Sequence, residues 1–282
     1  MTPSTSIEGK TAIITGGTTG LGRSMAAVWA AAGANVVTTG RREALGRELE
    51  EKVRAEGHEL TFVTGDVSRT EDCSATIDAA VRRYGRVDIL VNNAGIEGQI
   101  GNLHDLADED WDAVVDINLG GTFRMARGVI PLFQKQGGGS ILNIASINAA
   151  VALAHMAAYN ASKAAVVQFS NTIAVEYLFD GIRSNAILLG GVRGGETALR
   201  TQDGIAQYMR GPEFKRHVND DDPLSRVVLQ DPDEVAHTLA VFSSDAFRLV
   251  TGSVMAVDRA MTAGFTASSM VHMATAEMLT AG

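Results

Sequence analysis

The sequence predicts an α/β fold, a mainly parallel sheet with helices on both faces. Two observations carry this prediction. Short β-branched runs alternate along the chain with longer helical patterns, and a glycine-rich turn joins the first run to the first helix. Since no repeat, low-complexity tract or linker interrupts this rhythm, we expect a single domain over residues 1–282.

The alternation predicts each element in turn. Seven strands are expected at residues 11–15, 35–39, 60–64, 87–91, 140–145, 183–188 and 253–257. Helices are expected at 21–32, 43–56, 71–84, 108 to about 133, 157–179, and from Asp231, where a capping residue precedes Pro232. The segment 194–226 is polar and irregular. Residues 266–282 are expected to be an extension that covers a pocket or a partner subunit.

Composition and charge exclude several classes of protein. The formal net charge of -9 repels phosphates and anionic membranes, so we expect neither nucleic acid nor a membrane as a partner. A single cysteine, Cys73, excludes an internal disulfide, and the six histidines show no ligand spacing, so no metal is expected. The first eight residues do not resemble a signal peptide, and a cytoplasmic location fits.

A glycine-rich run, Thr15-Gly16-Gly17-Thr18-Thr19-Gly20-Leu21-Gly22, lies between the first strand and the first helix. Glycine permits a tight turn and a close approach to a pyrophosphate, and the helix N-terminus attracts that anion. The spacing Gly-x-x-x-Gly-x-Gly differs from the commoner Gly-x-Gly-x-x-Gly, and a turn without ligand is the alternative. Its position between strand and helix favours a dinucleotide.

Two arginines follow the second predicted strand. An NAD enzyme usually places a carboxylate there for the ribose 2′-hydroxyl, but here Arg41 and Arg42 precede the first carboxylate, Glu43. Guanidinium groups form bidentate contacts with phosphate, whereas positive charge at a helix N-terminus opposes the helix dipole. A solvated helix start is the alternative, and the pattern favours NADP over NAD.

Tyr159 and Lys163 form an i, i+4 pair on one face of a predicted helix. A free phenol has a pKa of about 10, and a nearby ammonium group favours the phenolate. We therefore expect Lys163, aided by an oxidised nicotinamide, to lower the pKa of Tyr159 toward the range useful for general acid/base catalysis. An ordinary surface pair is the alternative.

Three further features fall near the carboxyl ends of the strands, where such sheets bind ligands. Ser146 follows the fifth predicted strand, and the run Asn92-Asn-Ala-Gly95 ends the fourth. Asn118 falls inside the long predicted helix, which it is expected to interrupt because Asn is a mediocre helix former. Helix capping, turn formation and a tolerated polar residue are the respective alternatives.

Together these motifs, in this order and spacing from about residue 9 to 265, resemble the short-chain dehydrogenase/reductase family. The resemblance implies a doubly wound Rossmann fold with seven strands, and a homotetramer or homodimer. It implies that Tyr159 exchanges the proton and Ser146 orients the substrate oxygen. Lys163 would bind the nicotinamide ribose, and Asn118 would hold a relay water.

The resemblance also implies where the cofactor lies. Asp66 and Val67 would line the adenine, and Val192 would meet the carboxamide. With the glycine run and the arginines, the expected cofactor-binding residues are Gly16, Thr18, Thr19, Gly20, Leu21, Gly22, Arg41, Arg42, Asp66, Val67, Asn92, Ala94, Gly95, Lys163, Gly190 and Val192.

The sequence departs from the family pattern in two places. Leu189-Gly190 replaces the usual Pro-Gly, which we expect to loosen the loop against the nicotinamide. Asp258-Arg259-Ala260 replaces the usual Asp-Gly-Gly and puts the usual subunit contacts in doubt.

The expected function is interconversion of a secondary alcohol and a ketone, chiefly carbonyl reduction with NADPH. The expected substrate residues are Ile96, Asn148, His155, Met156 and Gly191, a mix that fits a medium-sized, partly apolar molecule. The segment 194–226 is expected to be a lid over the substrate. An NAD-linked alcohol or diol dehydrogenase of a catabolic pathway is the alternative, followed by a non-catalytic nucleotide-binding protein. A serine hydrolase is disfavoured because Ser146 lacks the glycines of a nucleophile elbow.

Overall fold

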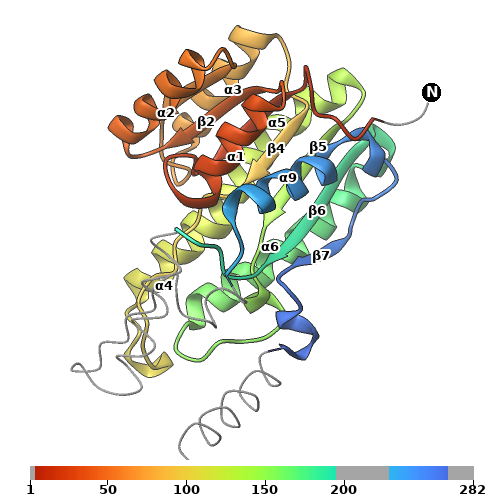
Figure 1. Ribbon diagram of the computed structural model, residues 1–282. Coiled ribbons are helices and arrows are strands. Elements are labelled where there is room, and N and C mark those ends of the chain that lie inside the picture. Colours follow the sequence, from red (N-terminus) through yellow and green to blue (C-terminus); the bar gives the residue numbers. More distant parts are fainter. Residues whose placement is uncertain (1–3, 195–228, 266–282) are drawn as a thin grey trace, which may run out of the picture.

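The computed structural model describes residues 4–194 and 229–265. A seven-stranded sheet lies between two layers of helices (Figure 1). The expected lid beyond Gly194 and the extension 266–282 lie outside the described residues. In the described ranges no helix combines the length and apolar character that crossing a membrane requires. The same ranges hold no cluster of His, Cys, Asp and Glu that could bind a metal ion.

All neighbouring strands of the sheet run parallel, in the order β3-β2-β1-β4-β5-β6-β7. The strands are β1 (Thr11–Thr15), β2 (Asn35–Gly40), β3 (Leu60–Thr64), β4 (Ile89–Asn92), β5 (Gly139–Ile144), β6 (Ile182–Leu189) and β7 (Val254–Val257). β1 and β3 have the predicted bounds, and the others differ by one or two residues at one or both ends. The predicted doubly wound parallel fold is confirmed.

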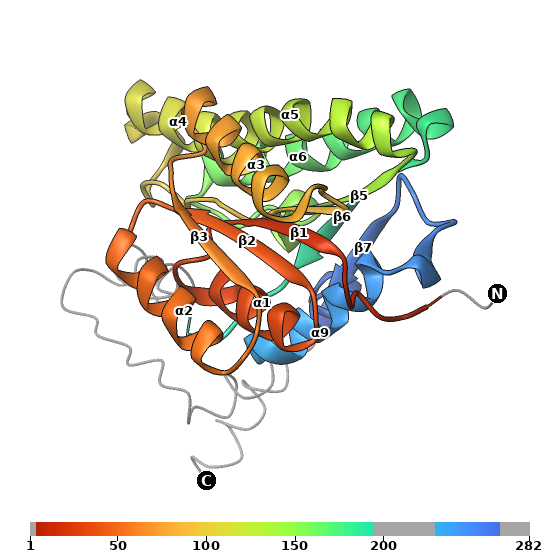
Figure 2. The same ribbon diagram turned by 90° about the horizontal axis from the view of Figure 1, so that it is seen from above.

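Helices cover both faces of the sheet. Figure 2 shows α1 (Gly20–Ala31), α2 (Glu43–Ala55) and α9 (Pro232–Ser243) on one face, and α3 (Thr70–Tyr84), α4 (Asp108–Val115), α5 (Gly121–Gln136) and α6 (Ala157–Glu176) on the other. A separate apolar cluster is buried beneath each layer, with Trp29 in the first and Phe133 in the second. Because both faces of the sheet are buried, its strands are almost continuously apolar.

The long helix predicted from 108 to about 133 is not continuous. A π-helical turn, Asp116–Gly120, separates α4 from α5, and Asn118 lies at its middle. The Asn118 side chain bonds the backbone of Ile96 in a neighbouring loop, which the widened turn allows. The helix predicted to reach residue 179 also stops earlier, at Glu176, and a 3-10 turn follows at Leu178–Asp180.

The strand order reverses at β1. β2 lies on one side of β1 and β4 on the other, so the connections that leave β1 and β4 diverge at the carboxyl edge. Such a switch point leaves a crevice outside the carboxyl ends of the strands, where ligands bind in open α/β sheets. The glycine-rich run follows β1 at this edge.

The loop that follows β6 is held in place, contrary to the loosening expected from Leu189-Gly190. Gly190 N donates to Val257 O at 3.0 Å, and Gln230 exchanges backbone hydrogen bonds with Gly191 and Arg193. A Cβ on Gly190 would lie 2.9 Å from the Asp258 Cα. The end of β7 therefore packs directly on this loop and fixes it without a proline.

The turn after β7 contains backbone strain. Arg259 and Ala260 have φ values of 49° and 65°, a region that favours glycine. The buried Asp258 carboxylate accepts bonds from the backbone N–H groups of Ala260 and Thr262, at 3.0 and 2.8 Å, and so holds the turn.

Ala260→Gly is expected to stabilise the fold by about 0.5–1 kcal/mol. Relief of the left-handed conformation gains about 1–2 kcal/mol, and the greater freedom of glycine in the unfolded chain offsets about 0.4–1 kcal/mol. Ala75→Gly is the matched control, because the exposed Ala75 lies in the middle of α3, where the change costs about 1 kcal/mol. Urea unfolding measures both. Destabilisation by both variants would contradict the prediction.

Candidate active site

The glycine-rich turn between β1 and α1 has no space for a side chain at Gly16, Gly17 or Gly22. Gly16 and Gly20 have positive φ values, and a Cβ on Gly17 would lie 1.7 Å from Thr38 Oγ1. Thr19, the N-cap residue of α1, makes no side-chain capping bond, and the first turn of α1 holds no acidic residue. The N-terminus of α1 is therefore suited to an anion, and the turn fits the pyrophosphate of a dinucleotide.

Thr15 joins this turn to the end of β4. Its hydroxyl accepts bonds from the backbone N–H groups of Asn93 and Ala94, both at 3.0 Å, and Asn93 Nδ2 donates to Thr15 O at 2.9 Å. A Cβ on Gly16 would lie 2.9 Å from the Ala94 Cα. The two expected cofactor segments therefore lie side by side. Asn92 points elsewhere, because its buried amide donates to Asn143 Oδ1 in the core.

The two expected arginines lie at the outer end of this crevice, and both are exposed. Arg42 Nη2 donates to Thr19 Oγ1, which ties Arg42 to the N-terminus of α1. Arg41 Nη1 lies 3.9 Å from Asp66 Oδ2. Val67 is buried, and a Cβ on Gly121 of α5 would overlap its side chain. The arginines and Asp66 therefore share one edge, whereas Val67 belongs to the core.

Ser146, Tyr159 and Lys163 converge at the carboxyl end of β5. Ser146 follows the strand as N-cap of a short 3-10 turn, Ile147–Ala149, and its hydroxyl is a hydrogen-bond partner of the Tyr159 hydroxyl. Tyr159 lies in the first turn of α6, and Lys163 Nζ lies 5.7 Å from the centre of its ring. The predicted catalytic side chains are therefore brought together by β5 and α6.

The expected direction of the Tyr159 pKa shift is wrong for the protein alone. Burial raises the pKa of Tyr159 to about 12, although the hydrogen bond with Ser146 opposes the rise. Lys163 Nζ donates to Ile144 O at 2.8 Å and lies 5.7 Å from the centre of the Tyr159 ring, yet burial of the phenol decides the direction of the pKa shift. Burial also lowers the pKa of Lys163 to about 8, so the ammonium form still predominates at pH 7.

Asn118 clamps the loop after β4 to the catalytic helix. Its side chain exchanges two hydrogen bonds, each of 2.8 Å, with the backbone of Ile96, and Nδ2 also donates to Ser162 Oγ at 3.0 Å. Both hydrogens of the amide are thereby engaged, so the side chain has no donor left for a relay water. A Cβ on Gly95 would lie 3.1 Å from Asn118 Oδ1 and 3.3 Å from Lys163 Nζ.

The expected substrate residues line the loops around this group. Asn148 Nδ2 donates to Asn160 Oδ1 at 2.9 Å and contacts Met156 Sδ at 3.8 Å, so both residues brace the 147–156 loop. His155 has a φ of 69°, and its carbonyl accepts a bond from Gly101 N at 3.0 Å. This bond joins the loop after β4 to the loop before α6. Ile96 is partly buried beside Asn118.

One charged residue at this site, Glu97, is not among the residues predicted from the sequence. Glu97 is partly buried, and its charge raises the pKa of both Tyr159 and Lys163. A lone glutamate in a polar loop has no distinctive pattern. Its position directly after Asn92-Asn-Ala-Gly95-Ile, at the carboxyl edge of the sheet, was the available signal.

Comparisons with known proteins agree with this geometry. Residues 10–204 match the family model for short chain dehydrogenases. The short chain dehydrogenase/reductase astE of Aspergillus oryzae is 36% identical over 259 residues, covering 90% of this chain and 95% of the relative. The 3beta-hydroxysteroid dehydrogenase 1 of Eggerthella lenta is 37% identical, with 91% and 95% covered.

Solved structures resemble the chain in the same way. A 3-ketoacyl-(acyl-carrier-protein) reductase from Brucella melitensis, complexed with NADH, is 34% identical with a TM-score of 0.77, covering 91% of this chain and 100% of the other. A variant of actinorhodin polyketide ketoreductase with NADPH is 32% identical with a TM-score of 0.83, and the shares covered are 90% and 97%. The chain belongs to the short-chain dehydrogenase/reductase family, and it is an oxidoreductase of the alcohol and ketone type.

Proposed function

We propose that the protein interconverts a secondary alcohol and a ketone on a medium-sized, partly apolar substrate, chiefly as an NADPH-linked carbonyl reductase. The convergence of Ser146, Tyr159 and Lys163 beside the glycine-rich turn carries this proposal. Relatives named for a hydroxysteroid and a ketoacyl group are consistent with a partly apolar substrate. The single, buried cysteine fits a cytoplasmic enzyme.

The side chains of this site supply proton transfer and orientation. A bound nicotinamide supplies the hydride that the substrate carbon accepts, or takes it from that carbon in the reverse direction. In reduction the Ser146 hydroxyl holds the carbonyl oxygen, and Tyr159 gives it the proton. Lys163 donates to Ile144 O and adds a positive charge near the phenol, while Asn118 fixes the facing loop. A relay water would be held by backbone rather than by the Asn118 amide.

The raised pKa of Tyr159 fits the reductive direction. A phenol with a pKa of about 12 is protonated at pH 7 and therefore ready to donate. Oxidation requires the phenolate, which becomes abundant only when positive charge is added beside the ring, as an oxidised nicotinamide would add it. The protein alone therefore favours the acid role of Tyr159.

The preference for NADP rests on the two exposed arginines. At the end of β2, Gly40 is followed by Arg41 and Arg42, and no carboxylate lies between this strand and α2. Arg42 already contacts Thr19, so a 2′-phosphate beside α1 would meet a guanidinium that is positioned by the protein.

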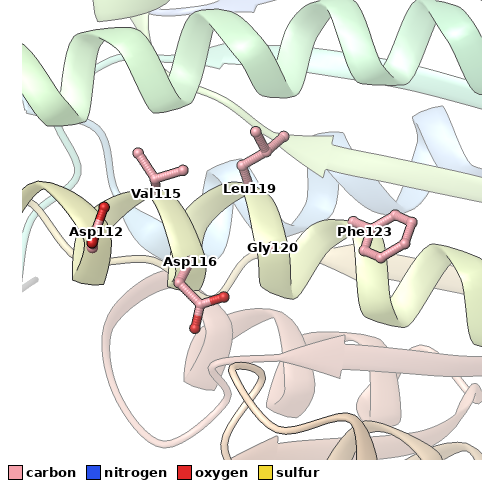
Figure 3. A pocket seen from close by; sticks show the side chains of 6 residues that line it. All are labelled: Asp112, Val115, Asp116, Leu119, Gly120 and Phe123. Carbon is pink, nitrogen blue, oxygen red and sulfur yellow. The ribbon is translucent and has the colours of Figure 1, made fainter.

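The exposed face formed by α4 and α5 carries apolar residues that would suit contact with a second copy of the chain in a homo-oligomer. Trp111 and Phe123 are exposed by 38% and 42%, and the Phe123 ring packs edge-on against Phe169 of α6. A hollow lies on this face, as Figure 3 shows, and its lining residues are Asp112, Val115, Asp116, Leu119, Gly120 and Phe123. Burial of Trp111, Phe123 and the apolar residues of the hollow against a second copy would stabilise a dimer or tetramer.

Tyr159→Phe is expected to lower kcat for ketone reduction by about 10²- to 10⁴-fold, because it removes the proton donor and little else. Loss of NADPH absorbance with a panel of ketones measures the rate. NADPH fluorescence titration is the control, and the dissociation constant should stay within about twofold. Undiminished turnover by the variant would reject Tyr159 as the general acid.

Arg41→Ala combined with Arg42→Ala is expected to weaken NADPH binding by about 10- to 100-fold and to leave NADH binding nearly unchanged. A charged hydrogen bond contributes about 1.5–3 kcal/mol, which gives this range. Arg82→Ala, an equal kind of charge change at an exposed site near the end of α3, serves as the control. Tighter binding of NADH than of NADPH by the unmodified protein would overturn the preference.

Phe123→Asp is expected to shift the protein toward a smaller assembly in sedimentation velocity, because the change places a charge in the proposed interface. Leu103→Asp, at a residue that is 71% exposed and does not line the hollow, should leave the assembly unchanged. A monomeric unmodified protein, or equal masses for protein and Phe123 variant, would contradict this interface.

A further inference from the structure

Glu97 is fixed on the loop that faces the catalytic helix. Its predecessor Ile96 is held at both N–H and carbonyl by Asn118. Its successor Gly98 has a φ of 76°, and a Cβ there would lie 2.4 Å from Val114 Cγ2 of α4. The backbone on each side of Glu97 is therefore anchored, and this fixes the point at which its side chain leaves the loop beside Asn118.

The charge of Glu97 acts on the reacting groups. It raises the pKa of both the Tyr159 phenol and the Lys163 ammonium, and within the described ranges it is the charged side chain that does so for both. Two residues before it, Gly95 approaches so closely that a Cβ would lie 3.3 Å from Lys163 Nζ. The loop that carries Glu97 therefore lies directly against the Lys163 amine, and charges interact strongly over such short separations.

A half-buried carboxylate at the edge of a substrate site can accept hydrogen bonds from the substrate. It accepts hydrogen bonds and donates none, and with about four lone-pair positions it can serve several donors at once. Glu97 makes a further contact in the chain, and this capacity allows a substrate donor as well. A donor beside the reacting carbon would therefore find a charged acceptor, whereas an anionic group there would be repelled.

We propose that Glu97 selects substrates that carry a second hydrogen-bond donor, a hydroxyl group, beside the carbon that is oxidised or reduced. This inference rests on the proposed function, because it assigns a substrate class to the same site. Glu97 is a specificity-determining residue in this role, and Tyr159 and Ser146 remain the groups that handle the reacting oxygen.

The negative charge of Glu97 gives it an effect on substrate choice that a neutral residue of the same loop would not have. A neutral acceptor would tolerate a carboxylate substituent on the substrate, but Glu97 would oppose it by like-charge repulsion. The Asn118 clamp uses only the backbone of Ile96, so removal of the Glu97 side chain leaves the bonds of the clamp in place.

The test compares two alcohols of nearly equal shape. One is trans-1,2-cyclohexanediol, and the other is trans-2-methoxycyclohexanol, whose methoxy group replaces the second hydroxyl without a donor. For the unmodified protein kcat/KM with oxidised cofactor is expected to be about 10- to 100-fold higher for the diol. Glu97→Ala should reduce this ratio to within about threefold of unity, chiefly by loss of activity toward the diol.

Two further variants make the result specific. Glu97→Gln keeps the size and one acceptor but removes the charge, so an intermediate ratio is expected, and it also serves if Glu97→Ala fails to fold. Gln99→Ala changes an exposed residue of the same loop and should leave the ratio unaltered. A second readout is the pH profile of kcat/KM, which should move to lower pH in Glu97→Gln because the negative charge no longer holds up the pKa of Lys163 and Tyr159.

The outcomes separate this inference from the proposed function. If the unmodified protein oxidises neither these alcohols nor a wider panel of secondary alcohols, the proposed function fails and the inference fails with it. If alcohols are oxidised but the diol has no advantage, or the advantage survives in both Glu97 variants, the inference is overturned and the proposed function stands.

Discussion

Lys163 keeps its ammonium group inside the protein, with only 5% of the residue exposed, and the surrounding structure is arranged around that constraint. A buried charge is unfavourable unless it is hydrogen-bonded and compensated. Ile144 O at the end of β5 accepts one of its bonds, and the Glu97 charge favours the ammonium form. Gly95 leaves room for the amine, since a Cβ there would lie 3.3 Å from Lys163 Nζ. The same helix then places Tyr159 one turn earlier, at the edge of the crevice.

The fold was largely predictable because its signals are local. Strands buried on both faces read as continuous apolar runs, and the turn after β1 requires glycines that are visible in the sequence. The break in the long helix was also expected at Asn118, since a mid-helix amide competes for backbone partners. Its partner, Ile96, was not predictable from spacing, because the contact is made between separate segments of the chain.

The pKa values of the site residues were less predictable from the sequence than the identity of those residues. The Tyr159 and Lys163 spacing identified the pair, but the expected pKa shift assumed that the amine would dominate. Burial is a property of the whole fold, and it is the largest influence on the pKa of the phenol, ahead of the hydrogen bond with Ser146. Glu97 was missed for a related reason, because its effect depends on how close its loop lies to α6. A pattern of residue types shows which titratable groups are present, but their pKa values depend on burial and on charges that the fold brings near.

These pKa values have a direct bearing on the direction of catalysis. Burial and the Glu97 charge both oppose formation of the Tyr159 phenolate, so the protein by itself holds the proton that a carbonyl oxygen would accept. The same charge favours the ammonium form of Lys163, which supplies the compensating positive charge. If a substrate hydroxyl donates to Glu97, the negative charge of the carboxylate is partly neutralised. The Glu97 charge then raises the pKa of Tyr159 by less. Binding of a donor-bearing alcohol would then make Tyr159 easier to deprotonate, so recognition of that alcohol and activation of the base would depend on one residue.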